Sequence, residues 1–198
     1  TFTALLLGAQ IAQIAIMWTG NALSRFGVQE FVETGKITKT FWARTAILIP
    51  NLLLIGILSP IWLPPIAEWL KIPAELFPLL LLYFGITALS MHTQAALHGA
   101  KLIRLQSILT FVERVIIFLI LIGLAATGEF SLLRAIWTYT LVPLAIVIFA
   151  IFKLKPVVSG IVLDLGMIKK ILIFSLPLPL YSVTSYLTFN HLDAIFIL

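Results

Sequence analysis

Long apolar runs separated by short charged segments constrain this chain more than any other feature. Hydrophobic residues make up 61% of its 198 positions and charged residues only 11%, whereas soluble domains carry about 25% charged residues. A helix of about 20 apolar residues is long enough to cross a bilayer. We therefore predict an all-α, polytopic membrane helix bundle. Six crossings are expected, at Phe2–Ala22, Thr45–Ile66, Leu76–Leu97, Ile108–Ala126, Leu132–Phe152 and Ile171–Leu198.

The charge of the connecting segments alternates along the chain. Residues 25–44, 98–107 and 153–170 are net basic, whereas residues 67–75 and 127–134 are acidic or neutral. Because cytoplasmic loops carry an excess of Lys and Arg, the basic segments are predicted to be cytoplasmic. The first crossing then starts outside. Without a signal sequence, this direction suggests that an earlier helix is missing and that the chain is a fragment.

Several classes of function find no support in the sequence. The net charge of +5 comes from basic residues dispersed among apolar spans, so no nucleic-acid partner is expected. The chain has no cysteine, no phosphate-binding loop and no paired carboxylates in an aqueous loop. His92, His98 and His191 lack metal-ligand spacing and are interpreted as helix-contact or interface residues. We therefore expect no enzyme, no cofactor and no metal site.

The segment 153–170 differs from the other loops. Three of its apolar residues share one helical face with Leu172 of the next predicted span: Ile161, Leu165 and Ile168. This pattern predicts an amphipathic helix on the cytoplasmic membrane surface, linking two bundles. Residues 1–152 would then hold the five crossings of a truncated N-terminal lobe, and residues 171–198 the first helix of a C-terminal lobe. Alternatively, these residues are only the first turns of the sixth crossing.

Polar residues recur at helical spacing inside four of the predicted crossings, in the first, third, fourth and sixth. Lipid tails cannot satisfy such stripes, so a shared polar cavity is the favoured interpretation. The alternative is that each residue only hydrogen-bonds to a neighbouring helix. The candidate cavity residues are Gln10, Gln13, Gln94, Glu113, Arg114, Ser182, Tyr186, Asn190 and Asp193. In the third crossing the stripe also includes Thr87, Met91, His98 and Lys101, and in the fourth it includes Gln106 and Thr110.

The adjacent pair Glu113 and Arg114 is the sharpest charged feature. Neighbouring residues point about 100° apart on a helix, so the two cannot simply face each other. A cavity-facing Arg114 would suit an anionic substrate, because guanidinium binds phosphate oxygens in a bidentate manner. The alternative is that both residues lie at the inner membrane interface.

Two segments resemble a known family. IFSLPLPLYSVTSYLTFNHLDAIFIL carries a Phe-x-x-Pro pattern at Phe174 and Pro177, then Ser182, Tyr186 and Asp193. It resembles the start of the second lobe in prokaryotic polysaccharide flippases. AALHGAKLIRLQSIL is similar to the loop between their fourth and fifth helices. This family is the oligosaccharide-lipid flippase branch of the multidrug, lipid and polysaccharide exporter superfamily.

The resemblance implies that the chain corresponds to helices two through seven of a two-lobed, twelve- to fourteen-helix transporter. Such a protein moves undecaprenyl-diphosphate-linked oligosaccharide across the cytoplasmic (inner) membrane by alternating access, for surface polysaccharide biosynthesis. The implied partners are the bilayer, the lipid-linked oligosaccharide and, as an open point, a coupling cation (proton or sodium). Basic cavity residues would hold the diphosphate, with Arg114 first and Arg25 and Arg104 next.

Other functions stay open from the residues alone. One is a cation-coupled drug or metabolite exporter of the same superfamily. Another is a membrane polymerase or glycosyltransferase, although such enzymes need substantial outer loops and the outer loops here are short. A third is a membrane scaffold that transports nothing.

Overall fold

The computed structural model describes residues 18–69 and 73–177, and in these ranges the chain forms helices and no strand. The elements are α2 (Gly20–Thr34), α3 (Thr38–Trp69), the short 3-10 helix η1 (Ala74–Leu76), α4 (Phe77–Gly99), α5 (Ile103–Ala126), α6 (Leu132–Leu154) and α7 (Leu165–Ser175). Four segments of the described chain are long and apolar enough to span a membrane: Thr38–Pro65, Ala74–Gly99, Ile103–Ala126 and Leu132–Leu154. The predicted all-α membrane helix bundle is therefore confirmed, and the chain is a multi-pass membrane protein.

These four segments correspond to the second through fifth predicted crossings. Two of them begin earlier than expected, α3 at Thr38 instead of Thr45 and α5 at Ile103 instead of Ile108. The first and sixth predicted crossings fall mostly outside the described residues.

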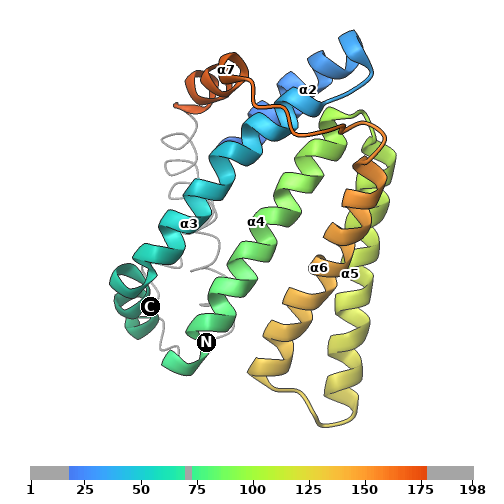
Figure 1. The fold of residues 1–198 in the computed structure, drawn as a ribbon. Coiled ribbons are helices and arrows are strands. Elements are labelled where there is room, and N and C mark those ends of the chain that lie inside the picture. The colour runs from blue at the N-terminus through green and yellow to red at the C-terminus, as the bar shows by residue number, and fades with distance from the viewer. Residues whose placement is uncertain (1–17, 70–72, 178–198) are drawn as a thin grey trace.

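The long helices α3, α4, α5 and α6 run side by side, and α2 and α7 lie at one end of them (Figure 1). The α2–α3 turn, the α4–α5 turn and the α6–α7 connection are all at this end, whereas the α5–α6 turn is at the other. We call it the basic end, after Lys36, Lys39, Lys101, Lys155, Lys169 and Lys170. Helix α4 is central, with its most extensive contacts to α6 and α2.

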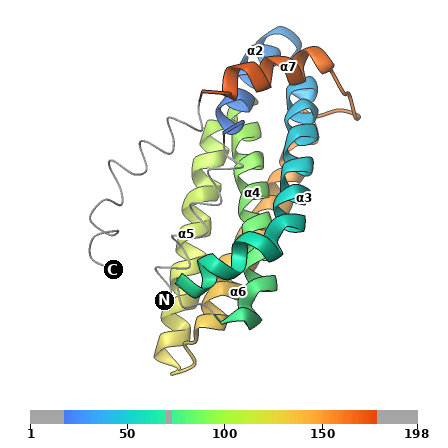
Figure 2. The same cartoon turned by 90° about the vertical axis from the view of Figure 1, so that its left-hand side faces the viewer.

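Helix α3 contains four prolines, and its last turns bend away from the axis of its first half (Figure 2). Each proline lacks the N–H of a helical hydrogen bond and crowds the preceding turn. Apolar side chains on this half are exposed, with Ile57 and Ile61 each 73% accessible. Such a surface suits hydrocarbon surroundings rather than water.

Residues 25–44, expected as a cytoplasmic loop, are instead mostly helical. Helix α2 ends at Thr34, and the next residue, Gly35, forms a left-handed C-cap with φ of 70° and an N–H bond to the Phe31 carbonyl (2.9 Å). Helix α3 starts three residues later. The loop prediction was therefore wrong, since only a tight turn separates the two helices.

A side chain of α2 caps the start of α3. Glu30, only 8% exposed, accepts hydrogen bonds from the Lys39 N–H (2.9 Å), the Thr40 N–H (2.8 Å) and the Thr40 hydroxyl (2.7 Å). A carboxylate at a helix N-terminus satisfies unpaired N–H groups and is favoured by the helix dipole. Glu30 therefore fixes the angle between α2 and α3.

Helices α2 and α4 touch through glycines. A Cβ atom added to Gly27 would lie 3.1 Å from the Gly99 Cα, and one added to Gly99 would lie 3.1 Å from the Leu23 carbonyl oxygen. Small residues allow this backbone approach, a common way for membrane helices to pack.

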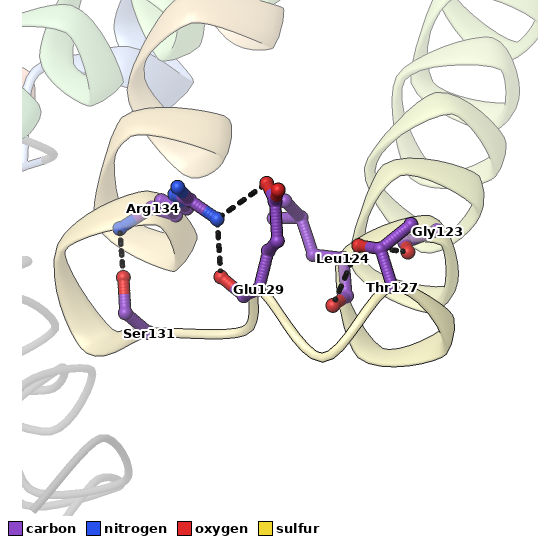
Figure 3. A network of polar contacts seen from close by, with 6 residues as sticks. All are labelled: Gly123, Leu124, Thr127, Glu129, Ser131 and Arg134. Carbon is purple, nitrogen blue, oxygen red and sulfur yellow. Dashed lines mark hydrogen bonds and ion pairs between the residues drawn. The ribbon is translucent and has the colours of Figure 1, made fainter.

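The α5–α6 turn is held by its own polar groups (Figure 3). Arg134 donates from Nη1 to the Glu129 carboxylate (2.6 Å) and to the Glu129 carbonyl (2.8 Å). Ser131 caps α6 by accepting from the Arg134 N–H at 3.3 Å. Gly128, with φ of 69°, makes the reversal.

Helix α7 corrects the start of the predicted amphipathic helix, whereas its predicted position on the membrane surface stays a prediction. It begins after Asp164, which caps it by accepting from the Met167 N–H at 3.0 Å. Ile161 therefore precedes the helix, and Leu165, predicted on the apolar face, is 79% exposed.

The buried face of α7 packs on protein. Ile171 is fully buried in a cluster with Ala22 of α2 and with Ala43 and Ile47 of α3, and Ile168 packs against it. The helix has 11 residues and ends at Ser175, too short to cross a bilayer alone. Residues 171–175 thus belong to α7, and the rest of the sixth predicted crossing lies mainly outside the described residues. The proposed division into two lobes stays a prediction.

Candidate functional site

A pocket of about 300 Å³ lies between α4, α5 and α6, within the membrane-length part of the bundle. Its lining residues are Tyr83, Thr87, Ser90, Met91 and Gln94 of α4, Thr110, Glu113 and Arg114 of α5, and Tyr139 and Pro143 of α6. Gln94, Glu113 and Arg114 were sequence candidates, and the structure brings these three together.

Helix α4 supplies its polar wall through residues three or four apart. Thr87, Met91 and Gln94 share one face, as their spacing predicted, whereas His98 of the same stripe is exposed outside the pocket. The Gln94 side chain donates from Nε2 to the Ser90 hydroxyl (3.3 Å), and Thr87 donates to the Tyr83 carbonyl (2.8 Å). These bonds satisfy donors locally and leave the hydroxyl oxygens able to accept from a ligand.

Glu113 is the unusual residue of the pocket. It is only 6% exposed, and its Oε2 atom has no hydrogen-bond partner among the described residues. Glu113 follows the start of α5 at Ile103 by ten residues, about 15 Å along the axis, and therefore lies near the midpoint of the helix. A buried carboxylate oxygen without a partner is energetically unfavourable, and such groups in membrane helices usually mark a binding or transport path.

Arg114 lines the same pocket but forms no ion pair with Glu113. Within the described chain, ion pairs form only between Lys39 and Asp164 and between Glu129 and Arg134. The expectation that the two adjacent residues do not simply face each other is therefore met. Arg114 is exposed, so its guanidinium remains available for a ligand.

The remaining candidate residues lie either outside the described part of the chain or away from the pocket. Gln10, Gln13, Ser182, Tyr186, Asn190 and Asp193 lie outside the described residues, so a cavity shared by all four stripes stays a prediction. Of the two secondary basic candidates, Arg25 lies over the Phe174 ring of α7 at 4.8 Å, and Arg104 is exposed in the first turn of α5. Neither lines the pocket.

Sequence reasoning missed a buried polar network between α3 and α4. Arg44, placed in a loop from the sequence, is 1% exposed in α3. Its Nη1 donates to His92 Nδ1 (2.6 Å) and its Nε to the Thr19 hydroxyl (3.3 Å). His92 Nε2 lies 3.1 Å from the Thr45 hydroxyl, which itself donates to the Phe41 carbonyl (2.8 Å).

This geometry fixes the state of His92. Because arginine can only donate, Nδ1 must be the acceptor and the ring proton sits on Nε2, facing Thr45. His92 is therefore a neutral helix-contact residue, as interpreted from the sequence. In the described part of the chain no carboxylate lies within 4.0 Å of Arg44, and no group of three His, Asp or Glu residues could hold a metal ion.

A second pocket, of about 350 Å³, opens at the basic end between α2, α3 and α7. Its acidic wall includes Glu30, which is committed to capping α3, and Asp164, which caps α7. Two of its three carboxylates therefore already have structural roles, so the α4–α5–α6 pocket is the stronger candidate site.

Comparison with protein-family models, with curated proteins and with solved structures found no match to this chain.

Proposed function

We propose that this chain is part of a membrane transporter, and that the α4–α5–α6 pocket contributes to its substrate path. The observation that carries the proposal is a pocket with a buried, unpartnered Glu113 carboxylate oxygen and an available Arg114, halfway along helices that are long enough to span a bilayer. The Arg44–His92 pair, which packs α3 against α4, is hydrogen-bonded. Among the described residues three buried side-chain atoms have no hydrogen-bond partner, Glu113 Oε2, Trp42 Nε1 and Ser175 Oγ. Of these three, only the Glu113 oxygen belongs to a carboxyl group and lies in the pocket.

The transported molecule is proposed to be a lipid-linked oligosaccharide, carried on undecaprenyl diphosphate. Arg114 suits the diphosphate, since guanidinium and phosphate form charge-assisted bidentate bonds. Gln94, Thr87 and Thr110 offer the amide and hydroxyl groups that bind sugar hydroxyls. The resemblance of the terminal segment to polysaccharide flippases supports the same substrate, a two-lobed architecture and a cytoplasmic-membrane location.

Pocket size limits what can bind at one time. At about 300 Å³, it is at the lower end of small-molecule sites. It can hold a diphosphate or a single sugar, but not a whole oligosaccharide. We therefore propose that it is one station on the path of the substrate rather than the complete cavity.

The test replaces Arg114 with Ala in the full-length protein. Surface polysaccharide should be lost and lipid-linked oligosaccharide should accumulate inside, while the protein level in the membrane persists. Arg104→Ala is the matched control, because Arg104 is an arginine of the same helix outside the pocket, and it should export normally. Normal export by Arg114→Ala would remove Arg114 from the mechanism.

A second candidate is a cation-coupled drug or metabolite exporter. The unpartnered Glu113 oxygen favours it as well, because a carboxylate in a membrane pocket can bind a proton or sodium. Deleting the gene distinguishes the two proposals. Greater drug susceptibility without accumulation of lipid-linked sugar would favour the exporter, and the opposite result would favour the flippase.

A further inference from the structure

The connection between α6 and α7 is fastened to the bundle at two points. At the first, the Ser159 N–H donates to the Thr38 hydroxyl (3.0 Å), and the Ile37 N–H donates to the Val157 carbonyl (2.9 Å). At the second, Asp164 caps α7 and lies 4.0 Å from Lys39 Nζ. Both points attach to the start of α3.

Between and just after these points the chain exposes large apolar side chains. Ile161 is 73% exposed, Val162 41%, Leu163 63% and Leu165 79%. We call residues 160–165 the apolar tip. Buried apolar residues of α7 begin only beyond it, so the tip itself is not packed on the described bundle. Clustered apolar side chains of this kind indicate a surface that meets a partner or a membrane.

The position of the apolar tip and the two lysines beside it, Lys36 and Lys39, point to a lipid headgroup layer. The one charged residue of the tip, Asp164, lies 4.0 Å from Lys39 Nζ. Its fastening points lie at Thr38 and Lys39, where the membrane-length segment Thr38–Pro65 begins. The connection stands out to the side of the bundle beside the first turns of α3 (Figure 2). Lys36 reaches Ser159 with its Nζ at 3.4 Å from Oγ, and Lys39 is 57% exposed.

We propose that the apolar tip inserts into the boundary between headgroups and acyl chains of a leaflet rich in anionic lipids. Its apolar side chains enter the boundary, and Lys36 and Lys39 contact the anionic headgroups. The tip thereby fixes the depth and orientation of α7 at the basic end. This role depends on no particular transported substrate, so it can be tested separately from the proposed function.

The absence of cysteine from this chain makes a site-specific test possible. Leu163→Cys, in the full-length protein with any other cysteine removed, is labelled with an environment-sensitive fluorophore. The protein is reconstituted into vesicles of phosphatidylcholine, with or without phosphatidylglycerol. A blue-shifted emission and quenching by lipids carrying a quencher near the headgroup are expected, and both should be stronger with phosphatidylglycerol. Ile161→Cys provides a second label position with the same expectation.

Two controls sharpen the result. A label at Glu33→Cys, an exposed acidic position on α2 at the same end, should stay in water and remain unquenched. Lys36→Gln combined with Leu163→Cys should lower the inserted-to-free ratio in phosphatidylglycerol vesicles by about fivefold, the contribution of one lysine near an anionic surface.

Two results would overturn the proposal. One is a label at both tip positions that remains in water in every vesicle. The other is a label shielded from water yet unreachable by the lipid quenchers, because protein would then cover the tip. Failure of the Arg114→Ala export test would leave these measurements unaffected.

Discussion

Two buried glutamates give the sharpest test of how charge is used in this bundle. Glu30 and Glu113 are 8% and 6% exposed, so both carboxylates have been removed from solvent. Glu30 accepts three hydrogen bonds from the start of α3, whereas Glu113 Oε2 accepts none from the described residues. The same substitution, Glu to Gln, should therefore lower stability at Glu30 but not at Glu113.

The expected magnitudes follow from these contacts. Glu30→Gln keeps one carbonyl oxygen but turns an NH₂ group toward at least one former donor, either of Lys39 or of Thr40. Hydrogen bonds to a charged group contribute about 1.5–3 kcal/mol each, so the free energy of unfolding should fall by roughly 2–4 kcal/mol. Glu113→Gln removes an ionisable group without breaking a bond at Oε2. The free energy of unfolding should stay level or rise by up to about 2 kcal/mol.

The assay is unfolding of the purified protein in mixed micelles, followed by circular dichroism and by tryptophan fluorescence. The two variants and the unsubstituted protein are compared under the same detergent and lipid conditions. In cells, export by Glu113→Gln should fall while its membrane level is maintained. Greater stability with less transport is the expected signature of a strained functional group.

One result would refute the reasoning. If Glu113→Gln lowered stability as much as Glu30→Gln, Glu113 would be held by partners like an ordinary structural carboxylate. The α4–α5–α6 pocket would then lose the feature that distinguishes it from simple helix packing. Unchanged export with unchanged stability would likewise make Glu113 dispensable and transfer the proposal to Arg114 alone.

Three further predictions concern packing and backbone geometry. Gly99→Ala should destabilise the bundle by about 1–3 kcal/mol, because its Cβ would meet α2. Gly123→Ala, whose Cβ would enter open space, should instead stabilise α5 by about 0.5–1 kcal/mol. Unfolding measurements in which both variants change stability in the same direction would contradict this prediction. A double-mutant cycle of Arg44→Met and His92→Leu should give a coupling of about 1–2 kcal/mol in unfolding free energy, and additivity would show that their 2.6 Å bond contributes nothing. Gly128→Ala should lower the unfolding free energy by about 1–2 kcal/mol, because the φ of 69° at this position is left-handed. An unchanged unfolding midpoint would show that alanine adopts this φ without strain.

The sequence predicted the long helices best where hydropathy alone decides their extent. Helix α6 was expected at Leu132–Phe152 and runs over Leu132–Leu154, and α4 was expected at Leu76–Leu97 and runs over Phe77–Gly99. The prediction was wrong at the α2–α3 corner, because the charged residues there have the composition of a loop. Their helical state depends on Glu30 capping α3 from another helix, a tertiary contact that a local pattern does not contain.

The start of α7 could have been predicted more closely. Helical periodicity grouped Ile161 with Ile168, but it does not say where a helix begins. Asp164 precedes the apolar run, and its position before Leu165 is that of an N-cap, which is the signal for the helix start. Asp164 separates the exposed apolar segment that precedes it from the face of α7 that is buried against α2 and α3. Helical periodicity alone had placed both on one helical face.

Part of the pocket lining could be predicted from the sequence, for a physical reason. Gln94, Glu113 and Arg114 stand out because polar residues are rare in apolar helices, and their spacing placed them on faces that could meet. Tyr83 and Tyr139 were missed. Tyr83 is four residues before Thr87 and extends the same stripe, so spacing could have found it. Tyr139 lies in a helix with no other strong polar signal, and only the packing of α6 against α4 brings it to the pocket.

Helix α4 links the two polar regions of the bundle. His92 faces Arg44 of α3, whereas Gln94 lines the pocket shared with α5 and α6. Residues two apart on a helix point about 200° apart, so the two side chains lie on nearly opposite faces of one rigid rod. The Arg44–His92 bond and the Gly27–Gly99 contact fix α4 against α2 and α3. A movement that opens the pocket without breaking these contacts must therefore displace α5 or α6. Helix α5 is the easier of the two to displace, because its contacts to α4 are much less extensive than those of α6.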